Sequence, residues 1–391
     1  MVSNRIKNIP PSPTLTINAK AKAMQAAGID VISLAAGEPD FDTPEHIKEA
    51  AIKAIKDGFT KYTAVGGIPE LKEAVVNYIA KEYGLNYSPE EVLISCGGKH
   101  ALYNLFQVIL NPGDEVIVPA PYWVSYPPMI LLAGGKPVIV ETEEKKGFKL
   151  TPEILKSYLT PWTRAIIINS PSNPTGSVYT KKELEALAEV LIGKDIWIVS
   201  DDVYHKILLE DNLKWFSIAN IDELKEKTFI INAVSKTYSM TGWRIGFLVG
   251  NKEIIRAATR LQGQSTSNPT SIAQKAALAA LNGPQDFLKD WLNAFKERKK
   301  RLLSLLKEIS KISCFEPKGA FYAFPNISAY LNKDISDSVK LAEYLLEKAH
   351  VGVVPGLAFG KEGYIRISFA TSLELLEKAI ERIKNSIEKL L

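Results

Sequence analysis

Short runs dense in valine, isoleucine and phenylalanine recur through the middle of the chain and alternate with helix-like segments. The apolar runs lie at 92–95, 115–119, 165–169, 197–200, 229–234 and 245–249. Helix-like stretches such as 99–110 and 181–191 separate several of them. Near-continuous apolar strands that alternate with helices are typical of a mostly parallel sheet that is buried on both faces. The pattern therefore predicts an α/β fold with helices flanking a central sheet.

The pattern changes after residue 284. A long charged amphipathic helix is expected at 286–310, followed by strands at 321–324 and 364–369 and helices at 336–348 and 372–390. The first residues are rich in proline, and a helix is expected around 18–27. We therefore expect a smaller α+β domain beside a large one. The predicted divisions are an arm at 1–14, a small domain from 15–45 and 291–391, and a large domain at 46–290.

Composition removes several classes of protein. Apolar residues make up 46% and charged residues 24%, so a mainly disordered chain is excluded. The net charge of +4 is spread over 48 basic and 44 acidic residues without a basic block, which argues against nucleic acid as a partner. The 4 histidines and 2 cysteines are too dispersed for a zinc motif, so a metal site would be carboxylate-rich or absent. No apolar run is long enough for a membrane span or a secretory signal, so we expect a cytoplasmic protein.

The segment 229–246, FIINAVSKTYSMTGWRIG, is the first candidate for chemistry. Its apolar strand runs into Ser235 and Lys236, and Arg244 follows eight residues later. A lysine at the end of a buried strand can have a lowered pKa and attack a carbonyl, or it can extend to solvent. The hydroxyl of Ser235 and the guanidinium of Arg244 are both suited to phosphate.

Polar residues also follow two other apolar strands. Asp201 and Tyr204 come at the end of the run IWIVSDDVY, and Asn173 stands in the turn SPSNPTG. Ligand sites in open α/β sheets lie at the carboxyl ends of the strands, which favours a functional role for these side chains. The alternatives are a helix cap at Asp201 and a simple turn at Asn173.

Three weaker signals complete the set. Gly98, after a strand and at a helix start, can present free amides to a phosphate. Trp123 stands in a loop where its ring could stack on a planar cofactor or simply pack. Arg366 interrupts an apolar strand, so it needs either a carboxylate ligand or an internal ion pair.

These groups are together the parts that pyridoxal phosphate requires. That cofactor needs a lysine for a Schiff base, an acid at its ring nitrogen, a stacking aromatic ring, donors to its 3-oxygen and a phosphate cradle. Each requirement is met by a residue named above, although no single motif is decisive.

The chain resembles the fold-type I, aspartate aminotransferase-like enzymes, in their class I aminotransferase branch. The resemblance runs nearly end to end. It is carried by AGEPDFDTP, KYTAVGGIPELKEAV, GGKHALYNL, PYWVSYP, SPSNPTG, SDDVY, SKTYSMTGWRIG, GAFYAFP and GYIRISFA. It implies a large domain that binds pyridoxal 5′-phosphate, a smaller α+β domain, and a homodimer with shared active sites.

The resemblance implies a role for each matching residue. Lys236 matches the Schiff-base lysine, Asp201 the partner of the ring nitrogen, and Tyr204 and Asn173 the donors to the 3-oxygen; Lys236, Asp201 and Tyr204 form the catalytic set. The implied phosphate cradle is Gly98, Lys99, Ser235, Arg244 and, from the partner subunit, Tyr62. The implied substrate site is Gly37, Trp123, Asn173 and Arg366, of which Arg366 binds the α-carboxylate and Trp123 also stacks on the cofactor ring. Asp202 departs from the glutamate of many relatives, at a position that points away from the ring.

The implied reaction moves an amino group from an amino acid to a 2-oxo acid in two half-reactions. Lys99, with Ser12 and Thr14, resembles the branch that binds a dicarboxylate side chain, which favours aspartate with 2-oxoglutarate; a solvated lysine is the alternative for Lys99. Aromatic or alanine-type amino acids are the next candidates. A β-lyase on the same fold and a non-catalytic ligand-sensing domain are the rival classes, although the arm before residue 36 is too short and proline-rich for a helix-turn-helix.

Overall fold

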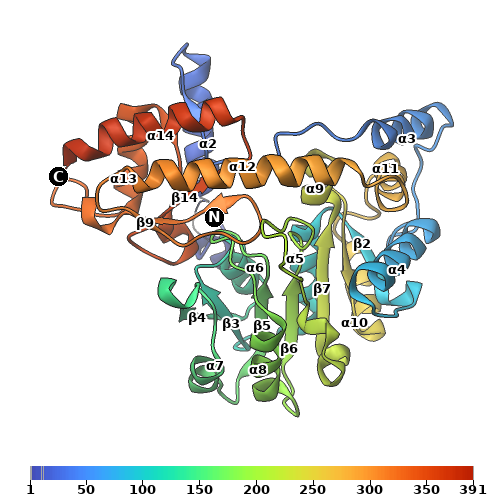
Figure 1. Ribbon diagram of the computed structural model, residues 1–391. Helices are drawn as coiled ribbons and strands as arrows, with labels where there is room; N and C mark the ends of the chain where they lie inside the picture. Colours follow the sequence, from blue (N-terminus) through green and yellow to red (C-terminus); the bar gives the residue numbers. More distant parts are fainter. Residues whose placement is uncertain (1, 10, 12, 391) are drawn as a thin grey trace.

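A computed structural model describes residues 2–9, 11 and 13–390, which form a large α/β unit and a smaller unit above it (Figure 1). The large unit is built on a seven-stranded sheet with the order β2-β8-β7-β6-β5-β3-β4. Its strands are β2 (Val92–Ser95), β3 (Glu115–Ala120), β4 (Lys136–Glu141), β5 (Thr163–Asn169), β6 (Trp197–Asp201), β7 (Thr228–Ala233) and β8 (Gly246–Val249). Only β8 runs antiparallel to its neighbours, so the predicted mostly parallel sheet is confirmed.

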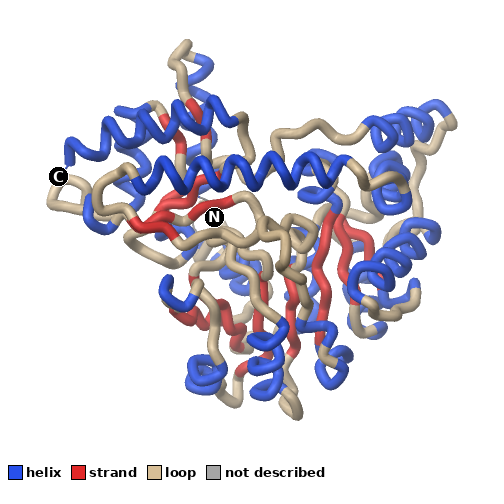
Figure 2. The backbone as a smooth tube through the Cα atoms, in the orientation of Figure 1, coloured by secondary structure: helices blue, strands red, loops and turns tan. Residues whose placement is uncertain are grey.

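The apolar strands are continuous because helices cover both faces of the sheet (Figure 2). Ile167 of β5 packs in the core that includes α5, whereas its neighbours Ile166 and Ile168 pack in the core that includes α8. The helices of this unit are α3 (Glu45–Lys56), α4 (Pro69–Tyr83), α5 (Gly98–Ile109), α6 (Tyr126–Leu132), α7 (Pro152–Tyr158), α8 (Lys181–Leu191), α9 (Val234–Thr237), α10 (Lys252–Gly263) and α11 (Ser271–Asn282). α8 begins where expected, because Thr180 and Glu183 form a capping box.

The smaller unit contains segments from both the N-terminal and the C-terminal parts of the sequence, because β1 (Ile32–Ser33) pairs in parallel with β12 (Val351–Gly352). A three-stranded sheet, β10 (Tyr322–Ala323), β14 (Ile365–Ser368) and β13 (Val354–Pro355), and the pair β9 (Ser313–Cys314) and β11 (Pro325–Asn326) complete its strands. Its helices are α2 (Pro13–Ala26), α13 (Ser338–Tyr344) and α14 (Leu373–Ile387), whereas α1 (Asn4–Lys7) contacts α6 of the large unit. β10, β14 and α14 match the expected strands and helix to within a few residues, and the expected helix at 336–348 changes to a wider π-helical turn at Leu345–Ala349. α2 begins before the expected helix, and the short strands β1, β9, β11, β12 and β13 were not expected.

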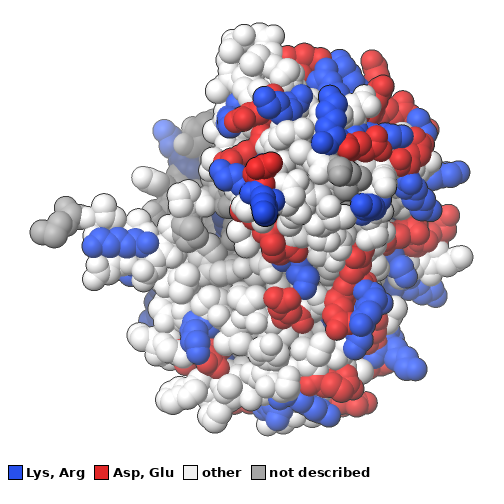
Figure 3. All heavy atoms as spheres, turned by 90° about the vertical axis from the view of Figure 1, so that its left-hand side faces the viewer, with Lys and Arg blue, Asp and Glu red and all other residues white. Residues whose placement is uncertain are grey.

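The helix α12 (Phe287–Lys307) runs from the neighbourhood of α11 to the smaller unit (Figure 1). Residue 291 lies within this continuous helix, and the division of the chain into the domains predicted above stays a prediction. No helix in the described part of the chain is long and apolar enough to cross a membrane. On the face shown in Figure 3, acidic and basic side chains are interspersed.

Two features of this architecture position the site. β5, β6 and β7 are parallel neighbours, so Asn169, Asp201 and Ala233 lie at one edge of the sheet, where Asn169 is directly opposite Asp201. The smaller unit lies over this same edge (Figure 1). Side chains from both units can therefore meet there.

Candidate active site

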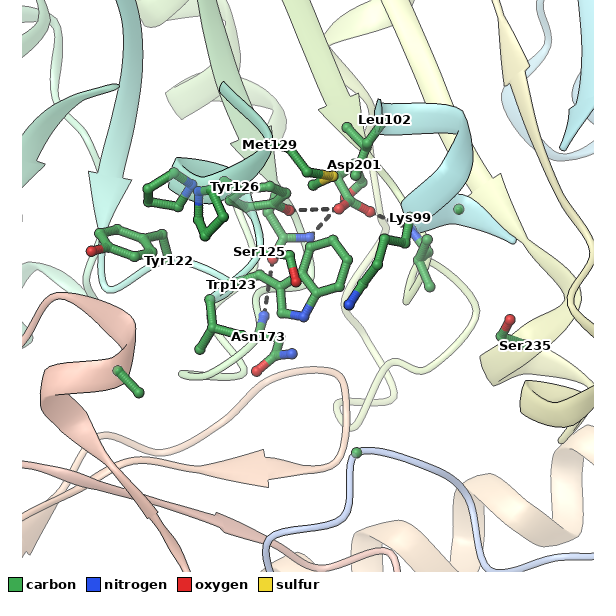
Figure 4. A pocket seen from close by; sticks show the side chains of 18 of the residues that line it. Lys99, Leu102, Tyr122, Trp123, Ser125, Tyr126, Met129, Asn173, Asp201 and Ser235 are labelled. Carbon is green, nitrogen blue, oxygen red and sulfur yellow. Dashed lines mark hydrogen bonds between the residues drawn. The ribbon is translucent and has the colours of Figure 1, made fainter. Parts of the chain in front are cut away.

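A cavity of about 810 Å³ opens at the carboxyl edge of the central sheet, beneath the smaller unit. Eleven of the residues that the sequence placed in the site line this cavity. They are Gly37, Gly98, Lys99, Trp123, Asn173, Asp201, Tyr204, Ser235, Lys236, Arg244 and Arg366. Figure 4 shows several of these side chains converging on one space.

Lys236 lies in the short helix α9, directly after β7, and its ammonium group donates to the carbonyl of Gly37. Burial lowers the pKa of Lys236 to about 8, and the cations Arg366, Arg244 and Lys99 act in the same direction. Only Glu38 opposes them. Part of the Lys236 amine is therefore unprotonated near neutral pH, where it can act as a nucleophile or exchange a proton.

Asp201 is the last residue of β6, and its carboxylate accepts a 2.5 Å hydrogen bond from the hydroxyl of Tyr126 (Figure 4). Burial raises the pKa of Asp201 to about 6, although the Tyr126 bond acts against this rise. A buried carboxylate at a cavity wall favours a cationic group on the ligand. Tyr126 was missed from the sequence, where it stood in PYWVSYP without a role.

The start of α5 and the segment 241–246, which leads into β8, form a close-packed cradle. The guanidinium of Arg244 donates to the carbonyls of Thr241 and Cys96 at 2.8 and 3.3 Å. A Cβ at Gly97, which has a φ of +90°, would lie 2.5 Å from Arg244 Nη2, and one at Gly246 would lie 2.3 Å from the amide nitrogen of Gly98. Glycine at both positions lets the backbone approach the free amides of the helix start, which suit an anion such as phosphate.

Trp123 and Lys99 line one wall together, with the lysine ammonium 5.1 Å from the centre of the indole ring (Figure 4). Burial lowers the pKa of Lys99, and the nearby Arg244 lowers it further. Lys99 has no acidic partner within the described residues. A cation in this position is available to an anionic ligand.

Arg366 of β14 is buried in the cavity wall, where its Nη1 donates to Asn173 Oδ1 at 3.0 Å and its Nη2 to the carbonyl of Ala35 at 2.7 Å. Its Nε has no partner, and no carboxylate pairs with the group in the described part of the chain. The sequence allowed an internal ion pair as the alternative role of Arg366, and no such pair is present among the described residues. A buried cation with free donors is suited to a carboxylate ligand.

Tyr204 follows β6, and its hydroxyl lies 2.8 Å from the hydroxyl of Tyr322. Tyr322 also lines the cavity, and the guanidinium of Arg366 lies 4.5 Å from the centre of its ring. The sequence contained Tyr322 in GAFYAFP but gave no reason to select it. Its neighbour in space, Tyr204, is 118 residues away along the chain.

The segment 36–44 contains Gly37, which lines the cavity, and side-chain hydrogen bonds hold the segment on two sides. Towards the large unit, Thr43 Oγ1 donates to the carbonyl of Ser239, and Thr241 Oγ1 donates to Glu38, both at 2.7 Å. Towards α12, Arg298 forms two hydrogen bonds with Asp40, at 2.7 and 2.9 Å. These contacts, which the sequence did not predict, hold Gly37 against Lys236.

Four further positions were named from the sequence. Tyr62 is 91% exposed and outside the cavity. Ser12 lies outside the described residues, and so does the side chain of Thr14. Asp202, which was expected to point away from the ring, is buried behind the cavity and accepts from Ser200 and Ser217 at 2.8 and 3.0 Å.

Comparison with known proteins agrees with this geometry. The family model for aminotransferase class I and II matches residues 29–383. The chain is 52% identical to an aspartate aminotransferase of Bacillus subtilis over 99% of both chains. It is 51% identical to a probable aspartate/prephenate aminotransferase of Rickettsia conorii, over 99% of this chain and 98% of that one.

Solved structures give the same result. An aspartate aminotransferase from Rhizobium meliloti superposes with a TM-score of 0.95 at 44% identity over 99% of both chains. The Thermus thermophilus aspartate aminotransferase with maleate superposes with a TM-score of 0.94 at 45% identity over the same share. The chain therefore belongs to the class I and II aminotransferases.

Proposed function

We propose that this pyridoxal-phosphate-dependent aminotransferase moves the amino group of L-aspartate to 2-oxoglutarate. The observation that supports it most strongly is the buried guanidinium of Arg366, which has no acidic partner in the described chain and shares a cavity with Lys236. Lys99 adds a second cation for a distal carboxylate in the same cavity. Two cations apart from the lysine nucleophile suit a dicarboxylic substrate.

The residues present fit the family's cofactor. The amides at the start of α5, with Lys99, Ser235 and Arg244, would hold the phosphate in the cradle that Gly97 and Gly246 keep open. Asp201 would pair with the ring nitrogen, Trp123 would stack on the ring, and Tyr204 and Asn173 would donate to the 3-oxygen. When bound, pyridoxal phosphate supplies an aldehyde carbon and a ring that accepts the electron pair of the substrate's Cα–H bond.

Lys236 has two roles in this proposal. Its amine is the nucleophile that holds the cofactor covalently at rest. Once an amino acid had displaced it, the same amine would take the Cα proton as general base and deliver it as general acid to the cofactor's aldehyde carbon. A pKa of about 8, lowered chiefly by burial, suits both directions of transfer near neutral pH.

Arg366 positions the substrate. The Nη protons that Asn173 and Ala35 do not use can bind an α-carboxylate while those two groups hold the guanidinium in place. A carboxylate fixed at that point sets the orientation of the Cα–H bond relative to Lys236, which is an effect of positioning. Gly37, held by the segment 36–44, covers the same space.

An aromatic amino donor is the second candidate, because part of the cavity wall is apolar. Ile9, Val124, Met129 and Leu357 contribute to that wall. Apolar side chains of this kind favour an uncharged substrate side chain.

We also propose that the enzyme is a cytoplasmic homodimer. Tyr62 has a large aromatic ring that is 91% exposed in the single chain, and the proposed role places its hydroxyl in the partner's phosphate cradle. Light scattering is expected to give twice the mass of one chain. A monomer would contradict the shared site.

The substrate is tested with a panel of amino donors and 2-oxoglutarate. We expect aspartate to have the highest kcat/KM, with the 2-oxo acid as the product. A higher kcat/KM for phenylalanine or alanine would identify that amino acid, and not aspartate, as the donor. Release of ammonia in place of an amino-acid product would favour the β-lyase alternative.

A further inference from the structure

Tyr322 is a buried tyrosine that connects three parts of the site. It lies on β10, is 0% exposed, and lines the cavity. Its hydroxyl is 2.8 Å from that of Tyr204, and its ring lies beneath the guanidinium of Arg366. A Cβ at Gly37 would lie 2.9 Å from the same hydroxyl. Tyr322 therefore touches the groups proposed to hold the cofactor's 3-oxygen and the substrate carboxylate.

Each of the two hydroxyls carries one proton, so the direction of the hydrogen bond between them determines which hydroxyl can still donate to another group. A phenol can donate one proton and can accept as well. If Tyr204 donated to Tyr322, it would have no proton left for a ligand in the cavity. If Tyr322 donates to Tyr204, the proton of Tyr204 is free to point into the cavity. Among the described residues, the hydroxyl of Tyr322 has Tyr204 as its one hydrogen-bond partner.

We propose that Tyr322 is a positioning residue, which donates to the oxygen of Tyr204 and so directs the Tyr204 hydroxyl towards the cofactor's 3-oxygen. The inference rests on the proposed function, in which Tyr204 donates to that oxygen. Donation from Tyr322 also polarises the Tyr204 hydroxyl and makes it a stronger donor. The ring of Tyr322 has a separate role as the surface on which Arg366 rests.

The electrostatic surroundings suit this direction of donation. Burial raises the pKa of both phenols, so each keeps its proton at neutral pH. The Arg366 guanidinium acts against this rise at both hydroxyls, but the pKa of Tyr204 is raised well above its usual value and that of Tyr322 is raised less, so Tyr322 is the stronger acid and the better donor of the pair. Other charged groups facing Tyr204 and Tyr322 are Asp201 and Glu38. Those facing Lys236 are Glu38, Arg366, Arg244 and Lys99.

Tyr322→Phe removes one hydroxyl and leaves the ring and all of these charged groups in place. A donor to the 3-oxygen reduces the negative charge with which that oxygen attracts the proton shared between Lys236 and the cofactor. The visible absorbance of the holoenzyme changes with pH when that proton is lost. The midpoint of this titration is the pH at which half of the enzyme has lost it. Weaker donation from Tyr204 should raise the midpoint in Tyr322→Phe by roughly 0.5 to 1 pH unit, the equivalent of one ordinary hydrogen bond.

A double-mutant cycle separates this role from a merely structural one. Tyr204→Phe should raise the midpoint at least as far, and Tyr322→Phe should add nothing in that background, because Tyr322 acts through Tyr204. Tyr330→Phe is the matched control, since Tyr330 is equally buried but bonds to Ser310, away from the cavity. Its midpoint should equal that of the wild type.

The outcomes distinguish the inference from the function on which it rests. If Tyr204→Phe raises the midpoint and Tyr322→Phe does not, the role of Tyr322 is wrong and that of Tyr204 stands. If neither variant changes the midpoint, both roles are wrong. Fluorotyrosine at position 322 keeps the fold and donates more strongly, so it should lower the midpoint; an unchanged or higher value would also overturn the inference.

Discussion

The substitution Arg366→Lys tests how the site holds a carboxylate, because it keeps the charge and changes the donors. A guanidinium has five N–H donors, and Asn173 and Ala35 use one each. The Nε–H is buried without a partner, so two Nη protons remain for a substrate carboxylate, which needs two donors. A lysine has three donors on one nitrogen, so after Asn173 and Ala35 are satisfied it has one left.

Arg366→Lys should therefore lose one charge-assisted hydrogen bond to the substrate, about 1.5 to 3 kcal/mol. That loss corresponds to a decrease of roughly 10- to 150-fold in kcat/KM for aspartate. The affinity of the apo protein for pyridoxal phosphate should not change. Steady-state kinetics and a cofactor titration measure the two quantities.

The matched control is Arg382→Lys, on α14, where Arg382 pairs with Asp30 at the surface. It should leave both quantities at the wild-type values. A kcat/KM for Arg366→Lys within threefold of the wild type would refute the carboxylate role. So would a loss of cofactor affinity that accounts for the whole decrease in activity.

Three further predictions concern other parts of the site. Lys99→Ala should lower kcat/KM for aspartate at least tenfold more than for phenylalanine, since one charge-assisted bond to the distal carboxylate is lost; equal effects on both substrates would remove that role. Gly246→Ala places a Cβ 2.3 Å from the amide of Gly98, so the Kd for pyridoxal phosphate should rise more than tenfold, whereas Gly242→Ala, with nothing within 4 Å, should leave it unchanged. Burial raises the pKa of Asp202 from 3.8 to about 7, so the folded state keeps a proton that the unfolded state releases, and this contribution to stability is lost progressively as pH rises from about 4 to about 7. Urea unfolding of the apo protein should show a smaller loss of stability from pH 5 to pH 7 in Asp202→Asn than in the wild type, and equal losses would refute this role of Asp202.

The central strands were predictable because both faces of the sheet are covered. β7, for example, is buried along its whole length and therefore appears in the sequence as one apolar run. The edge strand β4 was missed because its ends, Lys136 and Glu141, are exposed and charged. An edge strand has one neighbour, and its sequence carries a weaker apolar signal.

The site was predictable where chemistry coincides with a strand end, as at Asp201 and Lys236. Tyr126 and Tyr322 were not, because each acts through a contact with a residue far away in the sequence. An isolated tyrosine in an apolar segment indicates packing as readily as function. Arg298 was missed for the same reason, since its partner Asp40 is 258 residues away.

The central claim is tested most directly by one half-reaction, in which the purified holoenzyme is mixed with aspartate and no 2-oxo acid acceptor. We expect one equivalent of oxaloacetate per chain, a matching change in the cofactor's absorbance, and no ammonia. Lys236→Ala should give no oxaloacetate under the same conditions. Continuous release of ammonia, or oxaloacetate formation by Lys236→Ala at the wild-type level, would contradict the central claim.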